Sequence, residues 1–179
     1  MNNGKLRLSH SIMWLWAKGD YQDAIDAIHG KWREPNQYMI DGSRYHKEWE
    51  NEIKETGKMP AIFGGMELNN PKPEIKIEKQ ILDWLTVVGV LDLLDLPVGY
   101  DWKTGSGTAA DSARGFQHKV YKVLVPEMTR FEYHAYNQYT NTKTVEIVHL
   151  TDKTLEDGLE WIITIACDIR ATLEQAGKA

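Results

Sequence analysis

The chain has 179 residues, of which 42% are hydrophobic and 26% charged, and its formal net charge is −5 at neutral pH. These values predict one globular domain that buries roughly 70% of the surface of the unfolded chain, and they argue against a protein that coats nucleic acid through excess positive charge. The sequence has no apolar run near the ~20 residues of a membrane span and no secretory signal at its start, so we expect a cytoplasmic protein without a membrane partner.

Cys167 is the only cysteine. A chain with one thiol can form no internal disulfide, no cysteine-rich zinc site and no iron–sulfur cluster held by four thiolates. The apolar run before it, Ile163 to Ala166, predicts a thiol buried in the core, and a nucleophilic role is the weaker alternative.

The first third of the chain is predicted to be mostly helical. Apolar residues between Ile12 and Ile28 approximate one helical face, the segment from Gly30 to Asn36 is predicted to break the helix, and a second helix is expected from Asp41 to about Glu55. This part contains no cysteine, so neither a disulfide nor an iron–sulfur cluster can hold it together. We therefore expect side-chain packing to do so. The side chains expected to do so are Trp14, Trp16, Trp32 and Trp49.

Three strands are predicted in the middle of the chain. Ile75 and Ile77 alternate with charged residues in a short strand, and Thr86 to Leu94 is a β-branched, almost wholly apolar strand. Pro97 and Gly99 indicate a turn, which leads into a third strand from Val98 to Lys103.

The last part of the chain alternates helices with a hairpin. A glycine-rich loop over 104–108 is followed by a helix that Asp111 or Ser112 would cap and that ends near Val125, before Pro126. Two strands, 131–139 and 144–150, form a predicted hairpin around Asn141, and Thr151 or Asp152 begins a final helix. The apolar stripe of that helix comprises Leu155, Leu159, Ile162, Ala166, Ile169 and Leu173.

The order of these elements predicts an α/β fold, with a mixed central β-sheet of about five strands flanked by helices. We expect residues 1–179 to form a single domain. Its helical part covers residues 1–60, and its core covers residues 74–179.

Two neighbouring strands each carry an acid in an apolar setting. Asp92 lies in the strand Val88 to Asp95, and Asp101 and Lys103 share one face of the next strand. If the hairpin is symmetric about Leu96 and Pro97, Asp92 lies opposite Asp101 at a Cβ separation of ~4.5 to 5.5 Å. Two carboxylates at that distance favour a hard divalent cation between them, and the lysine would orient a water or neutralise a phosphate.

An alternative interpretation is an edge hairpin with solvated acids and a surface lysine. A lone Asp-x-Lys is common by chance, and the register could slip because Pro97 cannot occupy a left-handed turn position. The apolar context of both strands favours the cation site. The loop over 105–108 is no phosphate loop, because Lys103 precedes it instead of following its last glycine.

The segment from Gly89 to Gly105, followed by Gln117-x-x-x-Tyr121, closely resembles the RecB-like nuclease family of the PD-(D/E)XK superfamily. The upstream Gly42-x-x-x-His46 resembles that family's helix motif, and Leu8-Ser9-His10-Ser11 resembles its opening motif. The resemblance spans about residues 6–125 and implies a restriction-endonuclease-like core with nuclease activity. The motifs are specific together and weak one by one.

The resemblance implies a role for each matching residue. His46, Asp92, Asp101 and the carbonyl of Trp102 would bind Mg²⁺ or Mn²⁺, and Lys103 would position the attacking water and stabilise the scissile phosphate. A second set, on one helix, would contact the DNA backbone or support the site: Arg114, Gln117, His118 and Tyr121. Two further acids are candidates for the site, Glu50 and Glu78.

Structural roles are open for several of these residues. His46 alone would more often be a surface or capping histidine. Glu50 could pair with Lys47 or Lys54, Glu78 could pair with Lys76 or Lys79, and Tyr121 could be a core residue whose hydroxyl is bonded to the backbone.

The predicted function is phosphodiester hydrolysis by a metal-dependent DNA nuclease, with exonuclease action favoured, in DNA recombination, repair or replication. The resemblance implies a stand-alone nuclease of the kind that phages and mobile elements encode, acting in a prokaryotic or phage-infected cell, without the iron–sulfur cluster of some relatives. Its partner would be DNA, and a recombination or replication protein is a further candidate. The alternative is a non-catalytic nucleic-acid-binding or recombination-partner module on the same fold.

Overall fold

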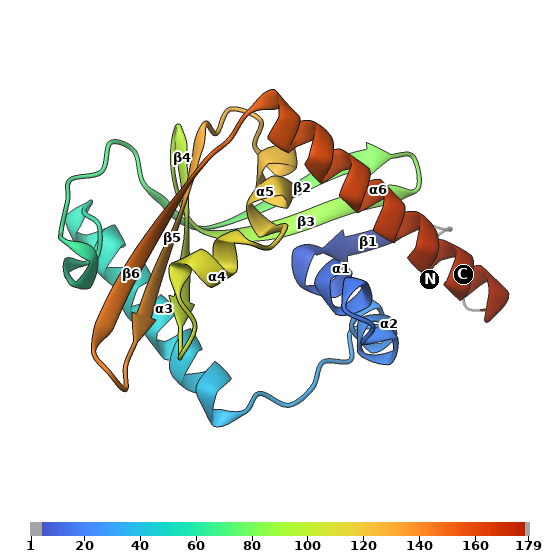
Figure 1. Cartoon of the computed structure of the whole chain (residues 1–179), viewed down its shortest axis with the longest axis horizontal. Helices are drawn as coiled ribbons and strands as arrows, with labels where there is room; N and C mark the ends of the chain where they lie inside the picture. The colour runs from blue at the N-terminus through green and yellow to red at the C-terminus, as the bar shows by residue number, and fades with distance from the viewer. Residues whose placement is uncertain (1–4, 178–179) are drawn as a thin grey trace.

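A computed structural model describes residues 5–177, so residues 1–4 and 178–179, the two ends of the predicted domain, lie outside the described part. A six-stranded sheet forms the centre, with helices packed against it (Figure 1). The strands are β1 (Leu6–Ser9), β2 (Lys72–Leu82), β3 (Leu85–Asp95), β4 (Val98–Thr104), β5 (Arg130–Asn137) and β6 (Thr142–His149). The helices are α1 (His10–Ala17), α2 (Tyr21–Ile28), α3 (Gln37–Thr56), the 3₁₀ turn η1 (Ala61–Phe63), α4 (Ala109–Ala113), α5 (Gln117–Leu124) and α6 (Asp152–Gln175).

Strand β3 is the central strand of the sheet and pairs with β1, β2 and β4. Antiparallel β2 pairs with it from Leu85 to Leu94 and so occupies one of its two hydrogen-bonding edges. The other edge is shared: parallel β1 pairs with residues 85–88, and antiparallel β4 pairs with residues 93–95. Residues 89–92 therefore have no described strand beside them on that edge, and the sheet forks there.

Each face of the sheet has its own apolar cluster. One cluster joins α1, α5 and α6 to β1, β3 and β5, and the smaller one packs α3 against β4 around Trp49 and Trp102. The prediction that four tryptophans hold the N-terminal part was half right, because Trp16 and Trp49 are buried whereas Trp14 and Trp32 are exposed. The two exposed tryptophans face a cavity described below.

The predicted fold class is confirmed, with a sixth strand that was not expected. β1 is only four residues long and leads directly into α1, so the periodicity of the helix masks it. β2 is longer than predicted, and exposed and half-buried residues alternate along it from 72 to 81. The β5–β6 turn at Asn141, which has a φ of 53°, and the final helix capped by Thr151 are confirmed.

Two local predictions were wrong. The single helix expected up to Val125 is two helices, α4 and α5, and the cap of α4 is Thr108, whose side chain bonds the backbone N–H of Asp111 while Asp111 bonds back. Asp111 is thus the third helical residue of a capping box and not the cap. Cys167 is exposed, because the α6 face that enters the core carries Ala166 and Ile169, and Cys167 lies about 100° further round the helix.

Within residues 5–177, none of the helices has both the length and the apolar character that a bilayer crossing requires.

Candidate active site

Asp92 and Asp101 meet at the fork of the sheet. The pairs Leu93↔Tyr100, Leu94↔Gly99 and Asp95↔Val98 confirm the symmetric register expected for the hairpin. The next pair in that register would be Asp92 and Asp101, but the backbone pairing of the two strands stops at Leu93 and Tyr100. The backbone N–H of Trp102 instead donates to Oδ2 of Asp92 at 2.7 Å. The Asp92 side chain therefore lies at the opening between the two strands.

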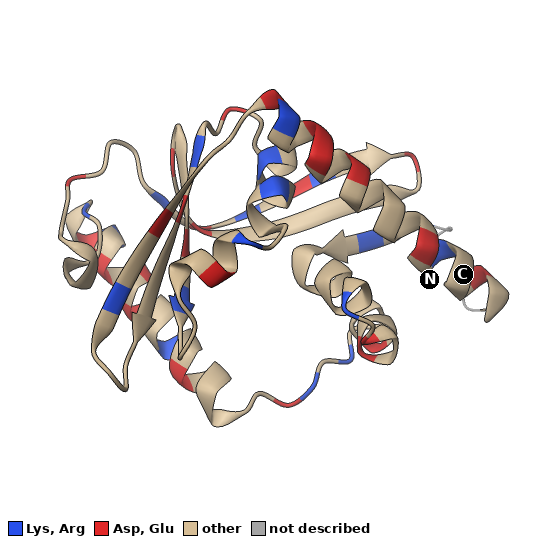
Figure 2. Ribbon diagram, viewed as in Figure 1, with Lys and Arg blue, Asp and Glu red and all other residues tan. Residues whose placement is uncertain are grey.

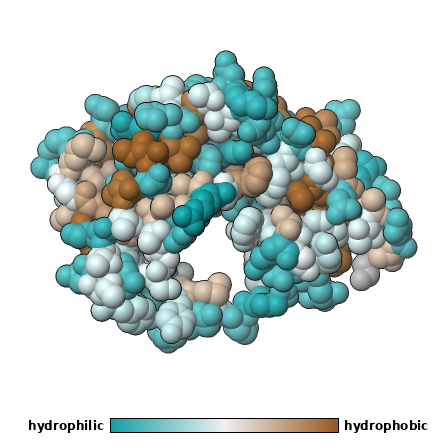
Figure 3. Space-filling model, in the orientation of Figure 1, coloured by the Kyte–Doolittle hydropathy of each residue, from teal (hydrophilic) through white to brown (hydrophobic). Residues whose placement is uncertain are grey.

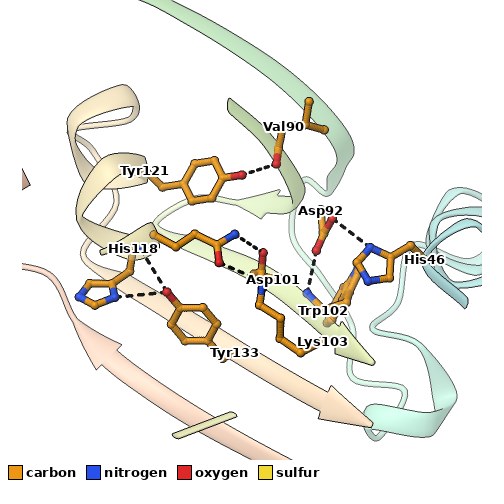
Figure 4. A network of polar contacts seen from close by, with 10 residues as sticks. His46, Val90, Asp92, Asp101, Trp102, Lys103, His118, Tyr121 and Tyr133 are labelled. Carbon is orange, nitrogen blue, oxygen red and sulfur yellow. Dashed lines mark hydrogen bonds and ion pairs between the residues drawn. The ribbon is translucent and has the colours of Figure 1, made fainter. Parts of the chain in front are cut away.

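Asp101, Lys103 and Gln117 form one polar network, of which Figure 4 labels Asp101 and Lys103. Gln117 donates from Nε2 to Oδ1 of Asp101 at 2.6 Å and accepts from Nζ of Lys103 through Oε1 at 2.9 Å. Nζ of Lys103 also lies 2.7 Å from Oδ2 of Asp101. A single amide thus orients both the carboxylate and the ammonium group.

Helix α5 approaches the fork closely enough to make these contacts because Gly89 has no side chain. A Cβ at Gly89 would lie 2.7 Å from ring carbon Cε1 of Tyr121 and 2.7 Å from Cδ1 of Leu124. Gln117 is the first residue of α5, and Tyr121 follows one turn later. The Tyr121 hydroxyl donates to the backbone carbonyl of Val90, in the stretch of β3 that has no strand beside it on this edge.

Helix α3 carries His46 to the other side of Asp92. A Cβ at Gly42 would lie 2.7 Å from Oγ1 of Thr104, so glycine allows α3 to approach the end of β4. One turn later, Nδ1 of His46 lies 3.3 Å from Oδ1 of Asp92. In the Gly42-x-x-x-His46 motif, the glycine thus allows close packing of α3, and the histidine one turn later is brought to the Asp92 carboxylate.

Burial and the close approach of charged groups shift the pKa values of Asp101 and His46. Asp101 is only 5% exposed, and burial raises its pKa above the ordinary value, with Lys103 opposing the shift and Asp92 adding to it. Burial alone would lower the pKa of His46, but the hydrogen bond and the charge of Asp92 outweigh it, so the net pKa is raised. The site holds excess negative charge that a cation would offset.

The donor set suits a hard divalent cation. Oδ2 of Asp101 is buried and forms an ion pair with the Lys103 ammonium at 2.7 Å. Within residues 5–177, no three His, Cys, Asp or Glu side chains gather closely enough to form a complete metal site. Mg²⁺ is usually held by one or two carboxylates and completes its shell with water and substrate phosphate, so Asp92 and Asp101 suffice as protein anchors.

The other candidate residues lie away from this network. Glu50 is buried between Lys47 and Lys54, and Glu78 pairs with Arg7 and Lys76 on the exposed surface of β2. These contacts match the structural roles that were left open for both acids, except that Glu50 is not on a solvated face.

Arg114 and His118 lie outside this network in different directions. Arg114 is exposed, pairs with Asp111 and lines the same cavity as Lys103 and Gln117. His118 is buried on the side of α5 turned from the site, where its Nδ1 lies 3.2 Å from the Tyr133 hydroxyl. Burial lowers the pKa of His118 to about 4. Tyr121, for its part, is 5% exposed and uses its hydroxyl on the backbone, as the core alternative described.

Glu74 was missed by the sequence interpretation. The β2–β3 register places it level with Asp92, between the pairs Pro73↔Leu93 and Ile75↔Leu91. Its φ of 53° is left-handed, a costly conformation for a residue other than glycine. Glu74 is exposed, but partial loss of solvent around its carboxyl raises its pKa, and the charge of Asp92 is the next cause. The alternation that predicts this strand begins at Glu74, but nothing in the local pattern marks this acid as a site residue.

The model of the PD-(D/E)XK nuclease superfamily matches residues 7–176. No curated protein matches the chain by sequence.

Several solved structures share the fold. An alkaline exonuclease (LHK-Exo) from Laribacter hongkongensis superposes with a TM-score of 0.61 and 11% identity over 98% of this chain and 92% of that one. Its complex with dAMP gives 0.56 and 12%, over 98% and 94%. A phage-related exonuclease from Haemophilus somnus 129PT gives 0.59 and 13%, over 89% and 83%.

Proposed function

The chain belongs to the PD-(D/E)XK nuclease superfamily, and on that premise we propose that it is a Mg²⁺- or Mn²⁺-dependent deoxyribonuclease that acts as an exonuclease. The observation that carries the proposal is the network in which Gln117 bridges Asp101 and Lys103 beside Asp92. A surface hairpin with solvated charges would not bury Asp101 or give its carboxylate a dedicated amide.

Nucleases of this superfamily typically use divalent metal ions. Asp92 and Asp101 would hold the ion here, with His46 and the carbonyl of Trp102 as further proposed ligands. When bound, such an ion lowers the pKa of a coordinated water and polarises the phosphate.

The chain's own residues have separable tasks in this proposal. Lys103, whose side chain is about one-third exposed, reaches the open side of the site and would stabilise negative charge on the scissile phosphate. Gln117 fixes the Lys103 ammonium and the Asp101 carboxylate relative to each other. The two groups therefore do not have to be brought into position during the reaction. Asp92, anchored by the N–H of Trp102, keeps one oxygen directed toward His46.

Exonuclease action is supported by the structural relatives. Two of them are described as exonucleases, and one was solved with dAMP, a deoxynucleoside monophosphate. A mononucleotide is the product that stepwise cleavage from a DNA end releases. The proposed biological setting is DNA recombination, repair or replication.

The test is a cleavage time course on linear DNA labelled at the 5′ end, linear DNA labelled at the 3′ end, and circular DNA. Each is incubated with Mg²⁺, with Mn²⁺ and with EDTA. We expect metal-dependent release of mononucleotides from linear DNA and none from circles, and Asp92→Asn is the inactive control. Intact DNA in both metals would contradict the proposal and favour the non-catalytic module, and nicked circles would contradict the exonuclease part alone.

A further inference from the structure

A large cavity opens beside the candidate active site. It has a volume of about 820 Å³, within the range of roughly 300–1,000 Å³ that holds a ligand of small-molecule size. Figure 3 shows it as an opening through the molecule in this view. The residues that line it and matter here are Trp14, Trp32, Lys31, Arg33, Lys103 and Gln117. Two of these, Lys103 and Gln117, belong to the active-site network, so the cavity leads to the site.

The segment 29–36 closes one side of this cavity. It links α2 to α3 and crosses the opening as a bridge without helix or strand (Figure 1). At one end the N–H of Lys31 bonds the carbonyl of Asp26 at 2.8 Å, and Arg33 pairs with Asp23 of α2. At the other end the side chain of Asn36 caps α3. The bridge is therefore anchored at both ends, and we call residues 29–36 the arch.

Two tryptophans face this cavity instead of the core. Trp32, on the arch, is 59% exposed, and Trp14, on α1, is 43% exposed. Large aromatic side chains are usually buried on folding, so their exposure in one cavity indicates a ligand with flat apolar faces. Unpaired DNA bases are such a ligand, because every base can stack on an aromatic ring whatever the sequence.

Cations and acids both line the cavity. Three of its cations already pair with neighbouring acids, as Lys18 with Asp20, Arg33 with Asp23 and Arg114 with Asp111. Within the described residues Lys31 has no ion pair, and blue segments mark the cations of the arch in Figure 2. Sites that bind a single strand combine cations for its backbone with aromatic rings on which its bases stack. This cavity offers both, and its lining also includes Asp20, Asp23, Asp26 and Asp111.

We propose that a single strand of DNA passes beneath the arch, with its bases against Trp32 and Trp14 and one end at Lys103 and Gln117. This inference rests on the proposed nuclease function and adds to it the form of the substrate. Because the arch is joined to α2 at one end and to α3 at the other, a strand can enter beneath it only by its own free end. The DNA must therefore be threaded through the opening.

An order-of-addition experiment tests threading without relying on cleavage. The uncleaving Asp101→Asn protein is mixed with an oligothymidylate that carries biotin at both ends, and streptavidin is added either before or after the protein. We expect no complex when the ends are blocked first. When they are blocked second, the complex should survive a chase with unlabelled competitor. Equal binding in both orders, or no binding to the unblocked strand, would overturn the proposal.

Substitutions in the arch give a second readout. Trp32→Ala should weaken binding of the unblocked oligothymidylate by about tenfold, and Trp32→Phe should retain most of the affinity. Tyr139→Ala is the matched control, because Tyr139 is an aromatic of similar exposure at the β5–β6 turn, outside the cavity. Unchanged affinity in Trp32→Ala would contradict the stacking role.

The two proposals fail in different ways. If wild-type protein degrades linear DNA but Asp101→Asn binds end-blocked and free strands alike, threading is wrong and the nuclease function stands. If no DNA is cleaved while end-dependent trapping is observed, the nuclease function is wrong and the threaded strand stands.

Discussion

The side-chain amide of Gln117 lies 2.6 Å from Oδ1 of Asp101, although 16 residues and the α4 turn separate the two along the chain. This hydrogen bond ties the start of α5 to the middle of β4. The same amide accepts from Lys103, so the geometry of both charged groups depends on one neutral side chain.

Gln117→Ala should slow cleavage without abolishing metal binding. The variant leaves the Lys103 ammonium with Asp101 as its partner and removes the amide hydrogen bond to the buried carboxylate, so we expect a single-turnover rate lower by roughly 10²-fold, as for loss of one preorganised contact. Asp92 and Asp101 remain, so Mn²⁺ affinity measured by calorimetry should change much less. A variant with the wild-type rate would show that the bridge is only structural.

Tyr121→Phe should destabilise the fold and leave the chemistry nearly intact. The Val90 carbonyl would lose its partner in a stretch of β3 that β1 and β4 leave uncovered, at a cost of about 1–3 kcal/mol. Urea denaturation measures this difference, with the exposed Tyr139→Phe as control. An unchanged free energy of unfolding together with weaker DNA binding would return Tyr121 to a role in contacting DNA.

His118 should make stability fall in acid. Its pKa is lowered by burial from 6.5 to about 4, so below pH 6.5 the unfolded chain binds a proton that the folded chain does not. Folding stability is thus lost as the pH falls from about 6.5 toward 4, at up to about 1.4 kcal/mol per pH unit. The Tyr133 hydroxyl that bonds Nδ1 suits the neutral imidazole.

The check on His118 is urea denaturation of wild type and His118→Gln at pH 7 and pH 5. We expect wild type to lose more stability than the variant over this interval. His10, whose pKa burial also lowers to about 4, is present in both proteins, and the charge of His118 is the smallest of the three causes of its shift, so the difference reports mainly on His118. Identical losses would show that His118 is protonated in the folded state.

The part of the fold that the sequence predicts well is the part that local patterns determine. The apolar run of β3, the alternation in β5 and β6, and the stripe of α6 each satisfy one periodicity over many residues. β1 is four residues long and its pairing partner, β3, lies about 80 residues away, so no local pattern reveals it.

The candidate site likewise has one part that the sequence predicts and another that depends on tertiary packing. The hairpin register follows from the turn at Leu96 and Pro97 and brings Asp92 near Asp101, which spacing alone predicts. The Gln117 bridge depends on how closely α5 packs against Gly89, and the position of Glu74 depends on a left-handed residue in β2. Both are tertiary features, and spacing in the sequence does not contain them.

The same limit explains the residues that face elsewhere. Gln117 and His118 are adjacent on α5, and the helix turns about 100° between them, so one side chain enters the site and the other enters the core. Motif spacing predicts Gln117 near the site and His118 was included as its neighbour, and only the packing of α5 separates them.

The measurement that tests the central claim most directly is Mn²⁺ titration by calorimetry combined with single-turnover DNA cleavage on wild type, Asp101→Asn and Lys103→Ala. Asp101→Asn keeps the shape of the side chain but removes the charge that would hold the cation, so metal affinity and cleavage should be lost together. Lys103→Ala should bind Mn²⁺ as well as wild type or slightly better, because a nearby positive charge is gone, and should cleave roughly 10²-fold more slowly or worse. A Lys103→Ala protein that cleaves at the wild-type rate, or an Asp101→Asn protein that binds Mn²⁺ and cuts DNA normally, would contradict the account.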